Sequence, residues 1–541
     1  MNFFSITARP VPILLIILMA ALLWGGQYAS RSLWEPDEAR YTYVAWEMHE
    51  SGNWLVPHRH GETYAHKPPL MFWLINISTL FTNGEFDGVS GRMPTFLGII
   101  LSLWAVSRLT ALWYNRQTAW YAIFILSTSY LFWHKAGTGQ IDVLLLGLQL
   151  SALYLLFKNE TQPSRLGLVA AFSLMGLAIL AKGPVGLIVP VGIYVTASLT
   201  AGNKACLARK FWLWGIPLSL VWPGAWLFAA WLFGASADYF NELLFTQNVG
   251  RFAGEFGGHY KPFYYYLKYL VIDFLPWTFL IPAALWATRK DKSTMGQARR
   301  ILGWVLFVVV FFSLAGGKRN LYILSVYPAL SMLVASVVSS LVSLSPRWRQ
   351  WTTYPLVILF ALFSIAGLAP LIPWPGFTLP LTIPVHLLLL FSLISAGTAV
   401  ILYRCQGKEG IRQQWVNALI ATMIIVECYV GTIIFPLFNP IKSPTALAHA
   451  VESTLPVDGR LILYRMNGEI LALYSKRQGI RFNDLNDLEQ FMNKTGHGIV
   501  SCTQKEWEHL EKKLAPDPPQ QILPHFFKMG GKSLMWFKYG K

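Results

Sequence analysis

The chain has 541 residues, of which 54% are hydrophobic and 13% are charged, with a formal net charge of +17. Soluble domains carry about 25% charged residues, so this composition excludes a soluble protein and favours a polytopic helical membrane protein. Basic loops on one side of a membrane explain the positive charge better than nucleic-acid binding does. The four cysteines lack the spacing of a disulfide framework or a cysteine metal site.

The apolar segments predict about thirteen membrane spans. They cover 10–28, 92–113, 118–134, 141–157, 165–181, 184–200, 211–233, 269–288, 301–315, 321–344, 352–372, 384–403 and 415–437. The first has no small-residue cleavage site and is expected to be an uncleaved anchor. Lys and Arg gather in alternate short loops, which predicts a cytoplasmic N-terminus, an outer C-terminus and long outer loops at about 29–91 and 234–268.

A charged segment directly follows the first span, Leu33-Trp34-Glu35-Pro36-Asp37-Glu38-Ala39-Arg40-Tyr41. Charge at a membrane edge is costly and usually functional. Adjacent carboxylates raise one another's pKa, so one of Asp37 and Glu38 can act on an acceptor while the other binds Arg40 or a metal. The alternative is a helix start, with Pro36 in its first turn and acidic residues after it. Both readings can hold together.

A second polar group lies in Tyr64-Ala65-His66-Lys67-Pro68-Pro69. The two prolines restrict the backbone, so Lys67 can be held in place to bind a lipid phosphate. The alternative is a lysine that only extends its ammonium to the membrane interface. Further along, Asp142 and Lys182 each lie at a predicted outer end of a span, where they can form a structural ion pair or bind a polar ligand.

The second long outer loop combines cations with aromatic residues at Arg251 and His259. Arginine favours a bidentate grip on phosphate, whereas an aromatic belt at the interface is the commoner explanation. His66 and His259 could share a zinc or manganese ion with Glu38 or another carboxylate, although two histidines far apart are a weak signal. Lys318, Arg319 and Tyr322 lie at another outer helix end, where cations oppose the positive-inside rule and indicate an anionic ligand.

The composition becomes polar after residue 440. Strand-like runs at 460–464, 498–501 and 533–537 alternate with helical patterns at 487–494 and 505–513. We therefore expect a membrane domain over 1–440 and a small α/β domain over 445–541 on the outer face.

The cations and carboxylates on the outer side fit a lipid-linked phosphate substrate, and the chain has neither a Walker sequence nor a dinucleotide-binding glycine fingerprint. A membrane glycosyltransferase that uses a polyprenyl-phosphate sugar matches this pattern. A protein O-glycosyltransferase is the nearer alternative. A lipid-linked sugar transporter or flippase is the alternative from another class, but transporters place their charges near the midplane and often repeat their halves.

At this point a resemblance becomes specific. The chain resembles the GT-C glycosyltransferases, most of all the bacterial 4-amino-4-deoxy-L-arabinose lipid A transferases and more distantly the protein O-mannosyltransferases. The matching motifs are Leu33 to Tyr41, Ser51-Gly52-Asn53-Trp54-Leu55-Val56-Pro57-His58, Lys67-Pro68, Lys182-Gly183, Arg251-Phe252, His259 with Pro262-Phe263-Tyr264-Tyr265-Tyr266, and Gly317-Lys318 before Tyr322-Ile323-Leu324.

The resemblance implies an all-α polytopic GT-C fold and a monomeric enzyme of the bacterial inner membrane. It implies transfer of the aminosugar from undecaprenyl phosphate to a lipid A phosphate at the periplasmic face, which gives resistance to polymyxin and other cationic peptides. Asp37 would be the catalytic carboxylate, with Glu38 beside it. Donor-phosphate binding would fall to Lys67, Arg251, Lys318 and Tyr322, and the cavity would be lined by Arg40, Tyr41, Tyr64, Asp142 and Lys182.

One position departs from that family. The residue before the lysine is typically a glutamate that can help to hold zinc with the loop histidine, and here it is His66. A metal site built from His66 and His259 is therefore an open expectation.

Overall fold

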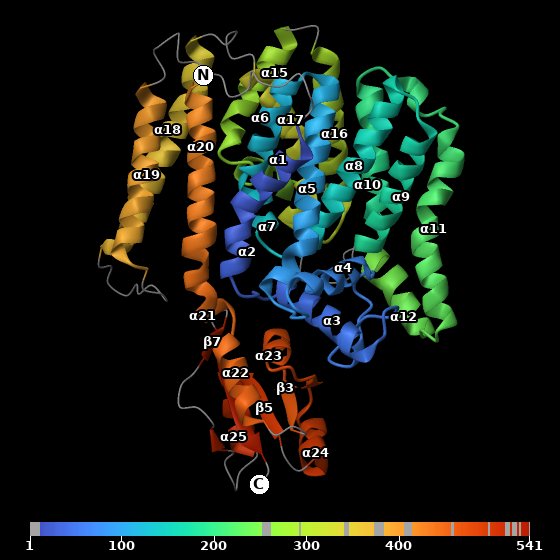
Figure 1. The fold of residues 1–541 in the computed structure, drawn as a ribbon, viewed down its shortest axis with the longest axis vertical. Helices are drawn as coiled ribbons and strands as arrows, with labels where there is room; N and C mark the ends of the chain where they lie inside the picture. Colours follow the sequence, from blue (N-terminus) through green and yellow to red (C-terminus); the bar gives the residue numbers. More distant parts are fainter. Residues whose placement is uncertain are drawn as a thin grey trace. The chain divides into compact units, whose positions relative to one another are not determined.

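The computed structural model describes residues 11–250, 261–290, 294–339, 346–372, 383–404, 414–455, 459–495, 498–513, 520–521, 527–529 and 532–539. Most of these residues are helical (Figure 1). They form two compact units. The helical unit comprises Met1–Gln27, His66–Pro68 and Thr95–Ile433, and the mixed unit comprises Tyr28–Ala65, Pro69–Pro94 and Ile434–Lys541.

Ten helical segments among the described residues are long and apolar enough to cross a membrane. They are Ile13–Ser30 (with α1, Ile13–Ala20, and α2, Gly26–Ser30), Gly88–Trp113 (α5), Ile141–Thr161 (α8), Arg165–Lys182 (α9), Phe211–Leu232 (α11), Met295–Leu314 (α16), Asn320–Val338 (η7, Asn320–Ser325, and α17, Val326–Val338), Arg347–Leu371 (largely α18, Pro346–Leu368), Val385–Arg404 (α19) and Gln414–Lys442 (including α20, Gln414–Tyr429). A bent pair, Tyr265–Ile272 (α14) and Trp277–Lys290 (ending in α15, Ile281–Lys290), makes an eleventh if it counts as one span.

The predicted count of thirteen spans is not confirmed, because two expected spans are shorter than a bilayer. The segment expected at 118–134 is broken into α6 (Arg116–Ser127) and α7 (Tyr130–Ala136). The segment expected at 184–200 is α10 (Val185–Thr200), whose 16 residues reach about 24 Å, against a hydrocarbon core of about 30 Å. Gly183 fixes the start of α10, since its φ of +81° ends α9.

The two broken segments of the helical unit meet at their breaks. Tyr130 N donates to Leu275 O at 3.0 Å, and Leu131 N donates to Asp273 O at 2.9 Å. The indole Nε1 of Trp277 donates to Thr128 Oγ1 at 3.1 Å. Backbone groups freed at a break within a membrane need partners inside the protein, and here each break supplies partners for the other.

A close helix contact holds α5 against α8. A Cβ atom at Gly98 would lie 2.5 Å from Val143 O, and one at Gly147 would lie 2.6 Å from Gly98 O. Small residues let membrane helices approach in this way without a hydrophobic driving force between them. The contact fixes the helix that carries Asp142.

The mixed unit combines short helices with a sheet (Figure 1). Its N-terminal part contains α3 (Asp37–Ser51), an antiparallel hairpin of β1 (His58–Arg59) and β2 (Glu62–Thr63), and α4 (Leu70–Ser78). Its C-terminal helices are α21 (Asn439–Lys442), α22 (Thr445–Thr454), α23 (Glu469–Tyr474), α24 (Leu485–Thr495) and α25 (Gln504–Lys513). The strands are β3 (Arg460–Tyr464), β4 (Gly479–Phe482), β5 (Gly498–Thr503), β6 (Gln520–Gln521), β7 (Phe527–Met529) and β8 (Lys532–Tyr539).

The sheet of the mixed unit runs in the order β4-β3-β5-β8-β6, and β7 also pairs with β8. β3 is parallel to β4 and β5, whereas β8 is antiparallel to its partners. Ile462, Val500 and Cys502 from β3 and β5 form a core with Leu488 of α24 and Leu510 of α25. The predicted strands and helices fall within these elements. The division of the chain near 440–445 stays a prediction, since residues 434–541 belong to the same compact unit as residues 28–65 and 69–94.

Candidate active site

The charged segment after the first span leads directly into α3. Pro36 precedes the helix, and Asp37 and Glu38 occupy its first turn, where the positive end of the helix dipole favours carboxylates. Asp37 is only 7% exposed and forms an ion pair with Arg40, one helical turn further on. The helix therefore presents Asp37 as a fixed, charge-paired carboxylate.

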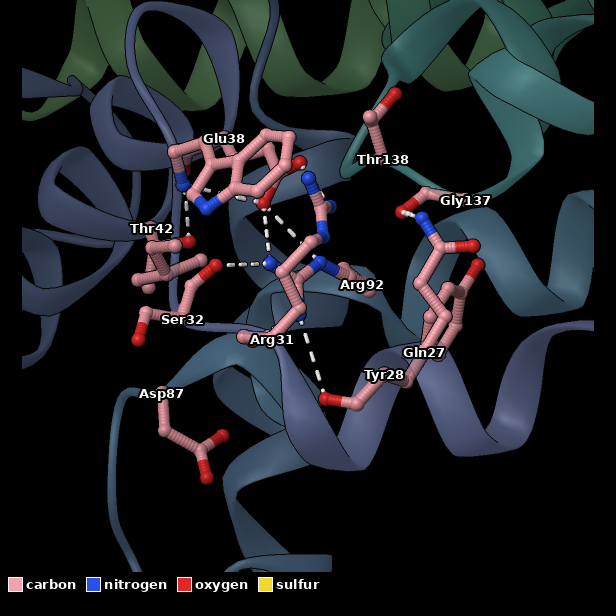
Figure 2. A network of polar contacts seen from close by, with 12 residues as sticks. Gln27, Tyr28, Arg31, Ser32, Glu38, Thr42, Asp87, Arg92, Gly137 and Thr138 are labelled. Atoms are coloured by element: carbon pink, nitrogen blue, oxygen red, sulfur yellow. Dashed lines mark hydrogen bonds and ion pairs between the residues drawn. The ribbon is translucent and has the colours of Figure 1, made fainter. Parts of the chain in front are cut away.

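Glu38 is held by two arginines (Figure 2). One oxygen accepts from Arg31, and the other accepts from Arg92 Nε at 3.0 Å and Nη2 at 2.6 Å. Burial raises the pKa of Glu38, but the charges and hydrogen bonds of Arg31 and Arg92 outweigh it and hold this pKa below its ordinary value. With 3% exposure and both oxygens engaged, Glu38 is better placed to position α3 than to serve as the second catalytic carboxylate.

Arg92 also fixes the backbone ahead of α3. It donates to Arg31 O at 2.7 Å and to Ser32 O at 2.6 Å. Neither Arg31 nor Arg92 is among the functional residues predicted from the sequence. The position of Arg92 in the sequence could have indicated its role. It is a charged residue at the first position of a predicted span, where charge rarely occurs without a function.

The aromatic residues expected to line the cavity are buried beside the same helix. Tyr41 of α3 and Tyr64 both pack against Phe72 of α4, with ring centroids 6.2 and 6.1 Å away. The Arg40 guanidinium lies 5.4 Å from the Tyr41 ring centroid, a favourable cation–π distance. These contacts fix the two tyrosines and Arg40, the ion-pair partner of Asp37, within the mixed unit.

A second group forms within the helical unit. Lys182, at the end of α9, is ion-paired with Asp142 in the first turn of α8. Its Nζ also lies 5.0 Å from the ring centroid of Tyr322 in η7. The expected proximity of Asp142 and Lys182 is therefore confirmed, and Tyr322 joins them from a third segment.

Lys318 is engaged by backbone carbonyls. Its Nζ donates to Ala315 O at 2.6 Å and to Lys261 O at 3.0 Å, and the residue is 5% exposed. Burial lowers the pKa of Lys318. These contacts favour a role in closing the loop between α16 and η7 over the expected role as a phosphate ligand.

Of the other residues expected to bind the donor phosphate or a metal, the structure describes Lys67 but not Arg251 or His259. Lys67 lies half-buried in the turn before α4, and the two prolines that follow it are buried. Arg251 lies outside the described residues, as does His259.

The expected metal site is described only in part. His66 Nε2 lies 3.6 Å from Glu242 Oε1, and both side chains are exposed to solvent. No group of three or more His, Cys, Asp or Glu side chains with the arrangement of a metal site occurs among the described residues. The carboxylate beside His66 is thus Glu242, whereas Glu38 is committed to its arginines.

The expected site residues therefore fall into two groups. Asp37, Glu38, Arg40, Tyr41 and Tyr64 belong to the mixed unit. The helical unit contains His66, Lys67, Asp142, Lys182, Lys318 and Tyr322.

Comparison with known proteins yields one family and several relatives. Residues 66–228 match the family described as dolichyl-phosphate-mannose-protein mannosyltransferase. The undecaprenyl phosphate-alpha-4-amino-4-deoxy-L-arabinose arabinosyl transferase of Edwardsiella ictaluri (strain 93-146) is 31% identical over 320 residues, which are 58% of this chain and 56% of that protein. The protein of the same name from Enterobacter sp. (strain 638) is 28% identical over 375 residues, covering 67% of this chain and 65% of the relative. The matches thus span less than two thirds of either relative.

Among the solved structures that match nearly the whole chain is one with a bound lipid phosphate. ArnT from Cupriavidus metallidurans, bound to undecaprenyl phosphate, superposes with a TM-score of 0.77 over 97% of each chain at 18% sequence identity. At this level of identity the match shows a common fold. The chain is therefore a multi-span membrane protein with the GT-C fold, and part of its sequence is similar to the undecaprenyl phosphate-aminoarabinose arabinosyl transferases.

Proposed function

We propose that this protein transfers 4-amino-4-deoxy-L-arabinose from undecaprenyl phosphate to a phosphate of lipid A. The observation that carries the proposal is Asp37, a buried carboxylate fixed by Arg40 at the start of α3. The relatives carry this activity in their names, and the matching ArnT structure contains undecaprenyl phosphate. Added aminosugar lowers the negative charge of lipid A, so the activity would give resistance to polymyxin and other cationic peptides.

The chemistry is a displacement with inversion at the sugar. An acceptor phosphate oxygen forms a bond to C1, while the bond from C1 to the undecaprenyl phosphate oxygen breaks and undecaprenyl phosphate leaves. A phosphate acceptor is already largely anionic near neutral pH, so Asp37 would orient the acceptor or take its last proton. A hydroxyl acceptor would need Asp37 as a full general base.

The departing phosphate requires positive charge nearby. Lys67, Arg251 and Tyr322 would bind the donor phosphate, and Lys182 would add a cation held in place by Asp142. The ion pair orients the Lys182 ammonium, and an arriving phosphate can compete with Asp142 for it. Lys318 would support this group through the loop that it closes.

A divalent metal remains part of the proposal. His66 and Glu242 supply an imidazole and a carboxylate close together, a donor pair that suits zinc, and His259 would complete it. When bound, the ion would supply positive charge that can hold a phosphate oxygen. Metal analysis of the purified protein, with and without His66→Ala, tests this point.

We also propose the placement that follows from the basic loops. The N-terminus would be cytoplasmic, and the Leu33–Tyr41 segment and residues 445–541 would lie on the periplasmic side of the inner membrane. The protein would act as a monomer.

Mass spectrometry of lipid A from cells with and without this protein tests the proposed function. We expect an aminoarabinose adduct that depends on the protein. An unchanged lipid A profile together with a lost glycoprotein would favour the protein O-glycosyltransferase alternative. A purified protein that moves a lipid-linked sugar across vesicles without transferring it would favour the flippase alternative.

A further inference from the structure

One asparagine near the end of the last span contacts the backbone and side chains that precede α3. Asn439 Oδ1 accepts from Ser32 N at 3.2 Å and from Trp34 Nε1 at 3.0 Å. Asn439 Nδ2 donates to Ser30 O at 3.2 Å. Both halves of the amide therefore engage residues 30–34, about 400 positions earlier in the chain.

Trp34 connects this asparagine to the arginines that hold Glu38. The Arg31 guanidinium lies 4.3 Å from the Trp34 ring centroid, within cation–π distance. Phe435 also packs against Trp34, with the two ring centroids 5.8 Å apart. The backbone N of Trp34 lies 3.4 Å from Glu38 Oε2. The side chain that Asn439 orients therefore packs against Arg31, which pairs with the neighbour of Asp37.

Other residues of the C-terminal part fix the same region. The Tyr474 hydroxyl accepts from Leu33 N at 3.4 Å. Gln478 Nε2 donates to Glu47 of α3 at 2.7 Å, and Arg59 pairs with Glu469 of α23. The segment from Ser30 to the end of α3 is thus held on several sides by residues beyond the last span.

We infer that Asn439 is a positioning residue for Asp37, acting through the hydrogen bond to Trp34, the Trp34–Arg31 contact and the Arg31–Glu38 ion pair. The inference rests on the proposed function, in which Asp37 addresses the acceptor. It gives the C-terminal part of the chain a role in transfer, as the support that fixes the first turn of α3. A small displacement of a fixed group lowers the rate of the chemical step more than it weakens substrate binding.

A double-mutant cycle with purified protein tests the inference. Trp34→Phe removes the indole donor and keeps an aromatic ring against Arg31 and Phe435, while Asn439→Leu removes the amide at similar volume. We expect each change to lower kcat for transfer from undecaprenyl phosphate-aminoarabinose to lipid A roughly tenfold, with the donor KM changed less than about twofold. Because both changes break one connection, the double variant should be no slower than the slower single variant.

Two further variants guard against a general loss of folding. Asn439→Asp keeps the acceptor for Ser32 N and Trp34 Nε1 but loses the donor to Ser30 O, so it should lower kcat less than Asn439→Leu does. Asn486→Leu alters an exposed asparagine in the same C-terminal part and should behave as wild type. If Asn439→Leu is not recovered folded, Trp34→Phe and Asn439→Asp still decide the matter.

The outcomes separate the two proposals. Three results would overturn the role of Asn439 alone, provided that the wild-type protein is active. They are additive losses of kcat in the double variant, a raised KM at unchanged kcat in the single variants, and wild-type rates in both Trp34→Phe and Asn439→Leu. Wild-type protein that transfers no sugar to lipid A overturns the proposed function and this inference with it.

Discussion

The two groups of candidate site residues are held by different physical means. In the mixed unit, Glu38 is buried between Arg31 and Arg92, all within 62 positions of the chain (Figure 2). In the helical unit, Lys182 and Asp142 are 14% and 9% exposed and come from segments 40 positions apart. A fully buried network cannot lose a member without leaving a charge unpaired, whereas the partly exposed Lys182 ammonium can exchange its partner for a ligand.

This difference indicates a division of labour. Under the proposed function, the mixed unit would supply a rigid frame for the carboxylate Asp37, and the helical unit would supply a cation, Lys182, that can exchange its protein partner for a phosphate. Substitutions in the two groups should therefore fail in different ways. The predictions below separate losses of chemistry, of folding and of donor binding.

Asp37→Asn should give the largest loss of transfer. Removing a general base or acceptor-orienting carboxylate costs about 10²- to 10⁴-fold in rate. Because the arginine that pairs with Asp37 is partly exposed, the variant should still be recovered folded. Steady-state transfer rates and the thermal unfolding midpoint, both measured on the same sample, check this prediction. A transfer rate of the variant within threefold of wild type would show that Asp37 has no catalytic role.

Glu38→Gln should damage folding as well as transfer. It leaves two buried guanidinium groups without their counter-charge, at a cost of about 3–5 kcal/mol. The matched change in the other group, Asp142→Asn, leaves a lysine that still reaches solvent and Tyr322 and should cost clearly less. Unfolding midpoints of the two variants in one detergent measure the contrast, and equal midpoints would contradict it.

Lys182→Ala should weaken the use of the donor. Loss of one charge-assisted contact to phosphate is worth about 1.5–3 kcal/mol, or roughly 10- to 100-fold in kcat/KM. Lys182→Arg keeps the charge and should recover part of the loss. Donor titrations of both variants decide this, since an unchanged kcat/KM in Lys182→Ala would confine the Asp142–Lys182 pair to a structural role.

The smallest predicted effect is a pH dependence of stability from His60. Burial and the Arg59 charge lower the pKa of His60 to about 3, and its ring lies 4.6 Å from that of Tyr43. Glu47 and Arg481 are the other charged groups near it. In the unfolded chain the His60 ring would bind a proton near its ordinary pKa of about 6.5. The contribution of neutral His60 to the free energy of unfolding is therefore complete above that pH and is lost as pH falls toward 3.

The slope attributable to His60 is at most about 1.4 kcal/mol per pH unit. Unfolding midpoints at pH 7 and pH 5 should therefore differ more in wild type than in His60→Gln. Identical pH dependence in the two proteins would show that His60 does not titrate in this way.

The sequence predicted those parts of the site that follow from local pattern. Asp37 and Glu38 in a helical first turn follow from Pro36 and the acidic pair, and the Asp142–Lys182 contact follows from both residues lying at predicted outer ends of spans. Hydropathy located the apolar segments between Ile13 and Lys442, but it does not reveal that the helices are broken at Thr128 and Asp273. Those breaks depend on hydrogen bonds between distant segments.

The contacts that fix the site were beyond sequence reasoning for the same reason. Glu38 looked like a second catalytic carboxylate because nothing local shows that Arg92, 54 positions away, claims its oxygens. Nothing in the sequence shows that the carbonyl oxygens of Ala315 and Lys261 accept hydrogen bonds from Lys318, whose predicted role as a phosphate ligand stays a prediction. Asn439 carries no motif, and only the folded chain brings it to Trp34.

The most direct test of the central claim is transfer by purified protein in proteoliposomes that contain undecaprenyl phosphate-aminoarabinose, with product detected by mass spectrometry. The acceptor is supplied either as lipid A with its phosphates or as lipid A from which they have been removed. We predict an aminoarabinose adduct with the phosphorylated acceptor only, and none from Asp37→Asn with either acceptor. Adducts on both acceptors, or equal yield from wild type and Asp37→Asn, would contradict it.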